Sequence, residues 1–193
     1  MNLKIILSIV SAIIMFIAYL PYFRDIILYK TKPHSYTWLI WILTQGTALA
    51  GMWYGGGNWG LLSMLTGTIL VCVVFVFSFK YGTKNVTRED TIILIAALCA
   101  ILVWWQLDKP ILSIIMVTAI DVLGYIPTFR KSYIEPWSET LITWFLFTVS
   151  NILAILSLSQ YNLLTTTYLT AITVANIALF LLCYFRRFKV SRS

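Results

Sequence analysis

Long apolar runs separated by short polar loops are the feature that most constrains the fold of this chain. A transmembrane α-helix needs about 20 mostly apolar residues, and 60% of the residues here are hydrophobic. The sequence therefore predicts an all-α membrane protein with seven transmembrane helices. The predicted helices are Leu3–Phe23, Tyr36–Tyr54, Trp59–Phe79, Thr91–Leu107, Pro110–Phe129, Trp137–Leu158 and Leu163–Tyr184.

The scarcity of charge excludes several classes of protein. Charged residues make up 11% of the 193 residues, against roughly 25% in soluble proteins. Seven crossings leave no room for a separate soluble domain, so residues 1–193 are expected to form one integral membrane domain. A soluble enzyme and a secreted disulfide scaffold are excluded. Paired carboxylates and nucleophile–base pairs are missing from the sequence pattern, so we expect no enzyme activity, no catalytic residue, no metal and no cofactor.

The basic residues are distributed unevenly between the two sides of the predicted helices. Of the 14 Lys and Arg residues, all except Lys4 and Lys109 lie on the side reached after odd-numbered helices. Lys and Arg are enriched in cytoplasmic loops of membrane proteins. The expected topology in a cell (inner) membrane therefore has the N-terminus outside and the C-terminus in the cytoplasm. We interpret the net charge of +7 as a topology signal, and no nucleic-acid partner is expected.

Two sequence blocks occur twice, in the same order. Tyr19–Arg24 recurs as Tyr125–Arg130 with four of six residues identical, and the Pro-x-Ser-x-Thr-x-x-x-Trp pattern of Pro33–Trp41 recurs as Pro136–Trp144. These blocks indicate a duplicated unit of three helices, with repeat one at 3–80 and repeat two at 110–187. Two directly joined units with an odd number of helices would be inverted, and a linker helix at 91–107 restores parallel repeats, giving a 3+1+3 plan.

The repeated residues resemble a known family. Four features resemble the PQ-loop superfamily, which includes the SWEET sugar transporters and cystinosin-like carriers. They are the Tyr19-Leu20-Pro21 triplet, the Arg after it, the Lys-rich turn and the Ser before an aromatic helix. The resemblance covers nearly the whole chain through the 3+1+3 plan and is closest to bacterial members of this size. The Gln that names the family is replaced by Tyr22 and Thr128. Vitamin carriers of the nicotinamide riboside type share the 3+1+3 plan and are a competing resemblance.

One charged residue, Asp121, lies well inside a predicted helix. Intramembrane carboxylates are costly and usually face a cavity or a partner. Asp121 could bind a proton or a cation coupled to transport, or accept a hydrogen bond from a substrate. Alternatively, it could be a structural residue that bridges helices, with Tyr125 one turn away as its partner. Its counterpart in the first repeat is Met15.

Polar and aromatic residues on other helices fall at a similar depth to Asp121. Trp144 and Asn151 share one face of the sixth helix, Trp41 is the counterpart of Trp144 in the second, and Asn176 lies in the seventh. Indole rings cover apolar faces of a solute while amides bind its hydroxyl or amide groups. Together with Asp121 and Tyr125, these residues are the predicted substrate-binding set.

Two prolines lie near the cytoplasmic ends of the first and fifth predicted helices, at Pro21 and Pro127. An interior proline removes a backbone hydrogen bond and kinks a helix. The resemblance to SWEET-like carriers implies that both act as gating hinges, and the alternative is that they end their helices at the interface.

Together these features favour a sugar- or metabolite-like small-solute transporter that works by alternating access. The alternative is a membrane-embedded receptor or accessory protein with the same fold and no transport activity, as the resemblance to sorting receptors of the superfamily allows. The expected partners are a small solute and the lipid bilayer, and a homo-oligomer is compatible with the sequence.

Overall fold

Helices form all the regular structure in the described part of the chain, which confirms the predicted all-α class. The computed structural model describes residues 3–30, 33, 35–82, 88, 91–92, 94–96, 98–99, 102, 109–134 and 136–191. The elements are α1 (Leu3–Ile27), α2 (Ser35–Tyr54), η1 (Asn58–Gly60), α3 (Leu61–Tyr81), α5 (Pro110–Ile134), η2 (Pro136–Ser138), α6 (Leu141–Ser157) and α7 (Leu163–Arg187).

Several helix ends differ from the ends of the predicted apolar runs. α1 and α5 continue past Phe23 and Phe129 to Ile27 and Ile134. A search for apolar runs stops at the next charged residue, yet Arg and Lys are good helix formers. α6 begins late, because Pro136–Ser138 forms a separate 3₁₀ turn.

The predicted linker helix falls only in part on the described residues. Positions 91, 92, 94–96, 98, 99 and 102 are helical, and Leu94 and Ala96 pack against the core. Positions 93, 97, 100, 101 and 103–107 of the predicted helix lie outside the described residues.

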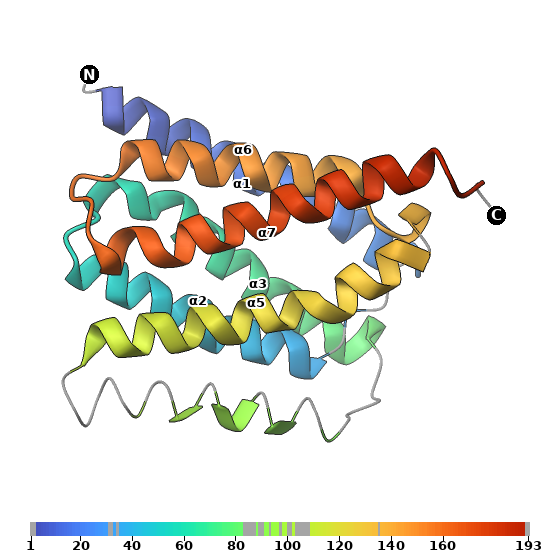
Figure 1. Ribbon diagram of the computed structural model, residues 1–193, viewed down its shortest axis with the longest axis horizontal. Coiled ribbons are helices and arrows are strands. Elements are labelled where there is room, and N and C mark those ends of the chain that lie inside the picture. The colour runs from blue at the N-terminus through green and yellow to red at the C-terminus, as the bar shows by residue number, and fades with distance from the viewer. Residues whose placement is uncertain are drawn as a thin grey trace.

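Three helical segments are long and apolar enough to cross a membrane, namely α1, Asn58–Tyr81 and α7. Many large apolar side chains on the helices face outward, including Ile69 and Val76 on α3. Apolar surface of this extent is typical of contact with lipid. These features suggest a membrane protein. Figure 1 shows the helices along one common axis, with the start of α1 and the finish of α7 at opposite ends.

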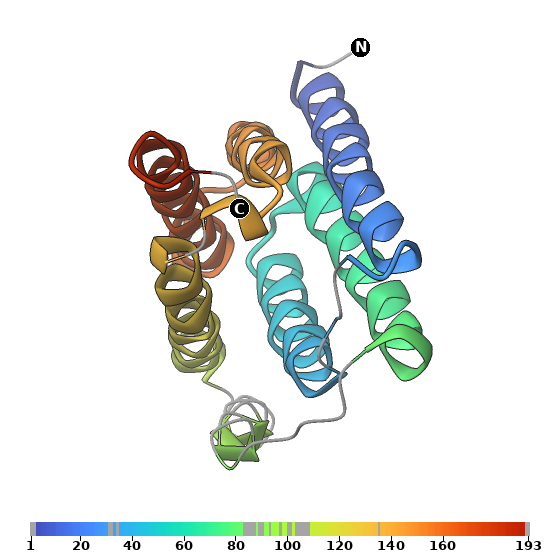
Figure 2. The same cartoon turned by 90° about the vertical axis from the view of Figure 1, so that its right-hand side faces the viewer.

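The long helices pack as a ring, which Figure 2 shows nearly end-on. Around the ring α1 packs against α3, α3 against α2, α2 against α5, α5 against α7, α7 against α6, and α6 against α1. Two further contacts, α2 with α7 and α3 with α6, cross the ring. Exchanging α1, α2 and α3 for α5, α6 and α7 converts each of these pairs into another packed pair. We call α1, α2 and α3 the first half and α5, α6 and α7 the second half, and exchanging the halves leaves the packing order unchanged.

Candidate functional site

A cavity of about 600 Å³ lies inside the ring. All six predicted substrate-binding residues line it, although they come from four helices: Trp41 from α2, Asp121 and Tyr125 from α5, Trp144 and Asn151 from α6, and Asn176 from α7. The structure therefore brings the predicted set together around one space. Whether these residues bind a solute stays a prediction.

Asp121 is 3% exposed and both of its carboxylate oxygens accept hydrogen bonds. The Thr44 hydroxyl donates to Oδ1 at 2.5 Å, and the Tyr168 hydroxyl donates to Oδ2. Asp121 thus joins α5 to α2 and α7. The partner proposed from sequence was wrong, because Tyr125 is turned toward α7.

Tyr125 and Asn176 form a second polar contact between α5 and α7. The Tyr125 hydroxyl donates to Oδ1 of Asn176 at 2.8 Å. Asn176 is 2% exposed, and this bond uses its carbonyl oxygen only. Its amide nitrogen, which carries two hydrogens, stays available as a donor on the cavity wall.

Trp144 and Asn151 bring a ring and an amide from α6. The Trp144 indole nitrogen donates to Oε2 of Glu139 at 3.1 Å, and its ring lies 6.1 Å from Tyr125 and 5.9 Å from Phe147 between centroids. Asn151 is 2% exposed and has no hydrogen-bond partner among the described residues, although it lines the cavity. Because buried amides are normally hydrogen-bonded, Asn151 points to a polar occupant.

Trp41 lies in a group of aromatic side chains on α1 and α2. Its ring meets Trp38 edge-on at 4.9 Å, and Trp38 in turn lies 5.5 Å from the Tyr22 ring. A β-carbon on Gly124 would lie 3.7 Å from the Trp41 indole nitrogen, so this ring reaches α5 one turn from Asp121. Among the described residues, the first half contributes four aromatic rings to the cavity wall, Tyr19, Tyr22, Trp38 and Trp41.

Residues at repeat-related positions line the cavity in pairs. Met15 and Asp121 are counterparts, as are Tyr19 and Tyr125, and both members of each pair face the cavity. Trp41 and its counterpart Trp144 do the same. The cavity thus lies between matching surfaces of the two halves.

Sequence reasoning missed several residues of the cavity wall. Thr44 is not part of the lining but bonds to Asp121, and it lies one turn from Trp41 on the same helix face, a spacing that could have identified it. Tyr168 carried no signal, because a single Tyr in an apolar helix is common. The other missed lining residues include Tyr19, Tyr22, Trp38, Gln45 and Phe147.

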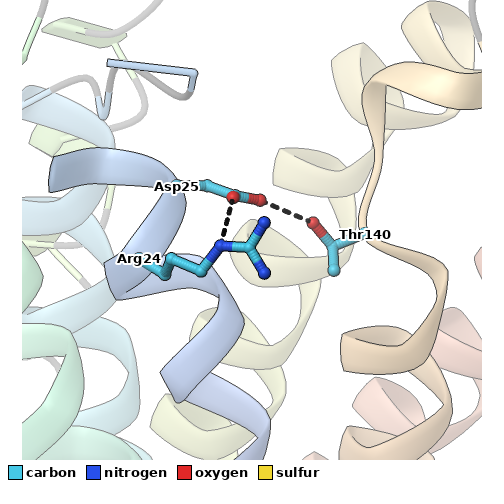
Figure 3. A network of polar contacts seen from close by, with 3 residues as sticks. All are labelled: Arg24, Asp25 and Thr140. Atoms are coloured by element: carbon cyan, nitrogen blue, oxygen red, sulfur yellow. Dashed lines mark hydrogen bonds and ion pairs between the residues drawn. The ribbon is translucent and has the colours of Figure 1, made fainter. Parts of the chain in front are cut away.

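The cavity extends to the end of the bundle where α1, α3, α5 and α7 finish. Lys30 and Pro33, from the loop after α1, and Glu139, just before α6, line it there. At this end Oδ2 of Asp25 accepts a hydrogen bond from the Thr140 hydroxyl at 3.4 Å, and Arg24 lies 3.9 Å from Oδ1 (Figure 3). This contact ties α1 to the start of α6 beside the cavity.

The other end of the bundle is closed by contacts between the two halves. The Ser11 hydroxyl donates to the Ser150 carbonyl at 2.7 Å, the Ser150 hydroxyl lies 2.8 Å from the Ser11 carbonyl, and the hydroxyls of Ser63 and Ser150 are 2.7 Å apart. All three serines are at most 1% exposed. We call Ser11, Ser63 and Ser150 the serine seal. It joins α1 and α3 of one half to α6 of the other.

The loops beyond the serine seal are also linked. The Lys4 ammonium donates to the Leu158 carbonyl at 2.7 Å, and the Asn162 amide donates to the Gly55 carbonyl at 2.7 Å. A β-carbon on Gly60 would lie 2.9 Å from Cα of Leu158, so only glycine allows this approach. Neither described loop at this end, 55–60 or 158–162, lines the cavity. The cavity is therefore closed on this side.

The helices continue through both proline positions. Pro21 is inside α1, which runs on to Ile27, and position 127 is within α5, which runs on to Ile134. The alternative that these prolines end their helices was therefore wrong. Pro21 does not line the cavity, and the hinge role of both residues stays a prediction.

No group of three His, Cys, Asp or Glu residues that could hold a metal occurs among the residues described by the structure. Comparison of the chain with protein-family models, curated proteins and solved structures finds no match.

Proposed function

We propose that this chain is a multi-pass membrane transporter that moves a small polar solute by alternating access. The observation that carries the proposal is the cavity, which lies between two related halves, is lined by amides and aromatic rings, and reaches one end of the bundle only. A polar cavity inside a largely apolar bundle is costly to maintain, and such sites in membrane proteins usually serve a ligand or an ion.

The packing of the two halves supports the 3+1+3 plan as part of this proposal. The ring order is unchanged when the halves are exchanged, and repeat-related residues of both halves line the cavity. Transporters with parallel repeats bind their solute at the interface between the repeats and move one repeat against the other. The cavity lies at that interface.

The direction of opening follows from the proposed topology. If the basic ends of the odd-numbered helices are cytoplasmic, then Lys30 and Glu139 mark a cytoplasmic opening, and the serine seal lies near the outer face. The structure would then be an inward-facing state. Transport would require the serine seal to separate and the end near Glu139 to close, with bending at Pro21 and Pro127.

Flux into proteoliposomes tests the proposal, with sugars, amino acids and vitamins offered as separate radiolabelled pools. We expect flux for at least one pool, and we expect Asn151→Ala and Asn176→Ala each to reduce it at least about tenfold by removing amides that contact the solute. Thr170→Ala is the matched control, because Thr170 is on α7 but faces outward, and should leave flux unchanged.

Two outcomes would contradict the proposal. The first is that folded, inserted protein gives no flux with any pool while a partner protein co-purifies in stoichiometric amount, which would favour a receptor or accessory protein. The second is flux that is equal in the Asn151→Ala, Asn176→Ala and control variants, which would separate transport from this cavity.

A further inference from the structure

We propose that the solute held in this cavity carries a positive charge. The Asp121 carboxylate would be its counter-ion, and the aromatic residues of the cavity wall would surround the charged group. The inference rests on the proposed function and narrows its solute from polar molecules in general to organic cations. It would place an ammonium or a similar group beside α5, inside the cavity.

The first argument is the charge balance of the cavity wall. Among the described residues, three charged side chains line it: Lys30 and Glu139 near the open end, and Asp121 inside. The first two offset each other formally, so Asp121 leaves the described part of the wall with a net negative charge. Asp121 has no ion-pair partner among the described residues, and the groups that contact its oxygens are the neutral hydroxyls of Thr44 and Tyr168.

Each oxygen of Asp121 has a hydroxyl partner, Thr44 on one and Tyr168 on the other. Both hydroxyls can donate to an ionised carboxylate, which accepts hydrogen bonds only. A buried charge of this kind is unfavourable until a positive charge approaches it. A neutral solute could add hydrogen bonds but could not neutralise the charge, whereas a cation would do both.

The second argument is the aromatic wall around the same space. Tyr125 is one helical turn from Asp121, Tyr168 contacts its carboxylate, and Trp41 reaches α5 beside Gly124. Trp144 continues this wall from Tyr125 at 6.1 Å between ring centroids. The faces of Trp and Tyr rings attract cations, most strongly where water is excluded. A carboxylate surrounded by such rings is the arrangement that recognises ammonium groups.

The amide side chains of the cavity indicate a second feature of the expected solute. Among the described residues, the Asn151 side chain has no hydrogen-bond partner, and the amide nitrogen of Asn176 has none either. These groups would bind a hydroxyl or carbonyl on the same molecule. The expected solute therefore has a positive group at one position and a hydrogen-bonding group at another.

Matched pairs of probes that differ only in charge test the inference on the full-length protein in detergent. Choline is compared with its carbon isostere 3,3-dimethyl-1-butanol, and acetylcholine with 3,3-dimethylbutyl acetate. Binding is followed by quenching of tryptophan fluorescence, since Trp38, Trp41 and Trp144 line the cavity. We expect each cation to bind at least about tenfold more tightly than its isostere. Equal binding of both members of each pair, or no binding by either cation, would overturn the inference.

Two variants locate the effect at Asp121. Asp121→Asn is expected to weaken cation binding roughly 30-fold or more and to leave the isosteres unaffected, because only the charge is removed. Asp25→Asn removes an equal charge from a residue that does not line the cavity, and should leave both probes unaffected. Undiminished cation binding by folded Asp121→Asn would overturn the inference. If that variant does not fold, the comparison of probe pairs on the wild type still decides whether the cavity prefers a cation.

Flux measurements separate this inference from the transport proposal. Flux of neutral sugars with no preference for cations would leave transport standing and overturn the charge requirement. Tight cation binding that depends on Asp121 without flux of any solute would support the charge requirement and contradict transport.

Discussion

Substitution of Ser150 by alanine offers a quantitative test of how the closed end of the bundle is held. The Ser150 hydroxyl lies 2.8 Å from the Ser11 carbonyl and 2.7 Å from the Ser63 hydroxyl. Alanine removes both contacts and leaves a buried hydroxyl and a buried carbonyl with fewer partners. Hydrogen bonds between membrane helices contribute about 0.6 kcal/mol on average and up to about 1.7 kcal/mol. The loss of two such bonds should therefore lower the free energy of unfolding by about 1–3 kcal/mol.

Ser157→Ala is the matched control for Ser150→Ala. Ser157 is on the same helix and fully buried, but its hydroxyl donates to the Ala154 carbonyl, one turn back in α6. Its removal breaks no contact between helices, and alanine is a better helix former than serine. We expect a change of less than about 0.5 kcal/mol.

The assay is reversible unfolding of both variants in mixed micelles by titration with a denaturing detergent, followed by tryptophan fluorescence. A double-mutant cycle with Ser63→Ala adds a second measurement, because two residues that share a hydrogen bond should cost less together than the sum of the single effects. Equal losses for Ser150→Ala and Ser157→Ala, or strictly additive effects of Ser63→Ala and Ser150→Ala, would refute the role given to the serine seal.

Three further predictions concern the loop contact, the proline and the topology. Gly60→Ala should lower the free energy of unfolding by about 1–3 kcal/mol, because the added β-carbon would lie 2.9 Å from Cα of Leu158. Gly46→Ala is the control, because its β-carbon would meet no atom within 4 Å. It should be neutral or stabilising in the same titration. Pro21→Ala should raise thermal stability by allowing another backbone hydrogen bond in α1 and should slow proteoliposome flux; unchanged flux would contradict the hinge. A C-terminal alkaline phosphatase fusion should be inactive in cells and a fluorescent-protein fusion bright, and active phosphatase would overturn the topology.

Hydrophobic runs predicted the helices well because a membrane-spanning segment must be apolar along nearly its whole length. They predicted the ends poorly. α1 passes Arg24 and reaches Ile27, since the backbone hydrogen bonds of a helix can continue beyond the apolar region. Pro136 shows the opposite case, where a 3₁₀ turn shortens the predicted sixth helix.

The cavity residues could be predicted from sequence where their chemistry was rare in an apolar helix. Asp121, Asn151 and Asn176 stood out for that reason, and all three line the cavity. Two residues outside the lining, Ser63 of the serine seal and Thr44 beside Asp121, did not, because small hydroxyl residues occur throughout membrane helices as packing groups. Their partners depend on how each helix is rotated against its neighbours, and that rotation is set by packing between helices.

Asp121 connects the two halves and is also the proposed counter-ion of the solute. It belongs to α5 of the second half, and its Oδ1 accepts from Thr44 on α2 of the first half. In the proposed transport cycle, a cation that draws this carboxylate toward itself would compete with the Thr44 bond and would bind the two conformations with different affinity. A ligand shifts a conformational equilibrium only through such a difference in affinity. The contact between Thr44 and Asp121 would then link occupancy of the cavity to the relative position of the halves.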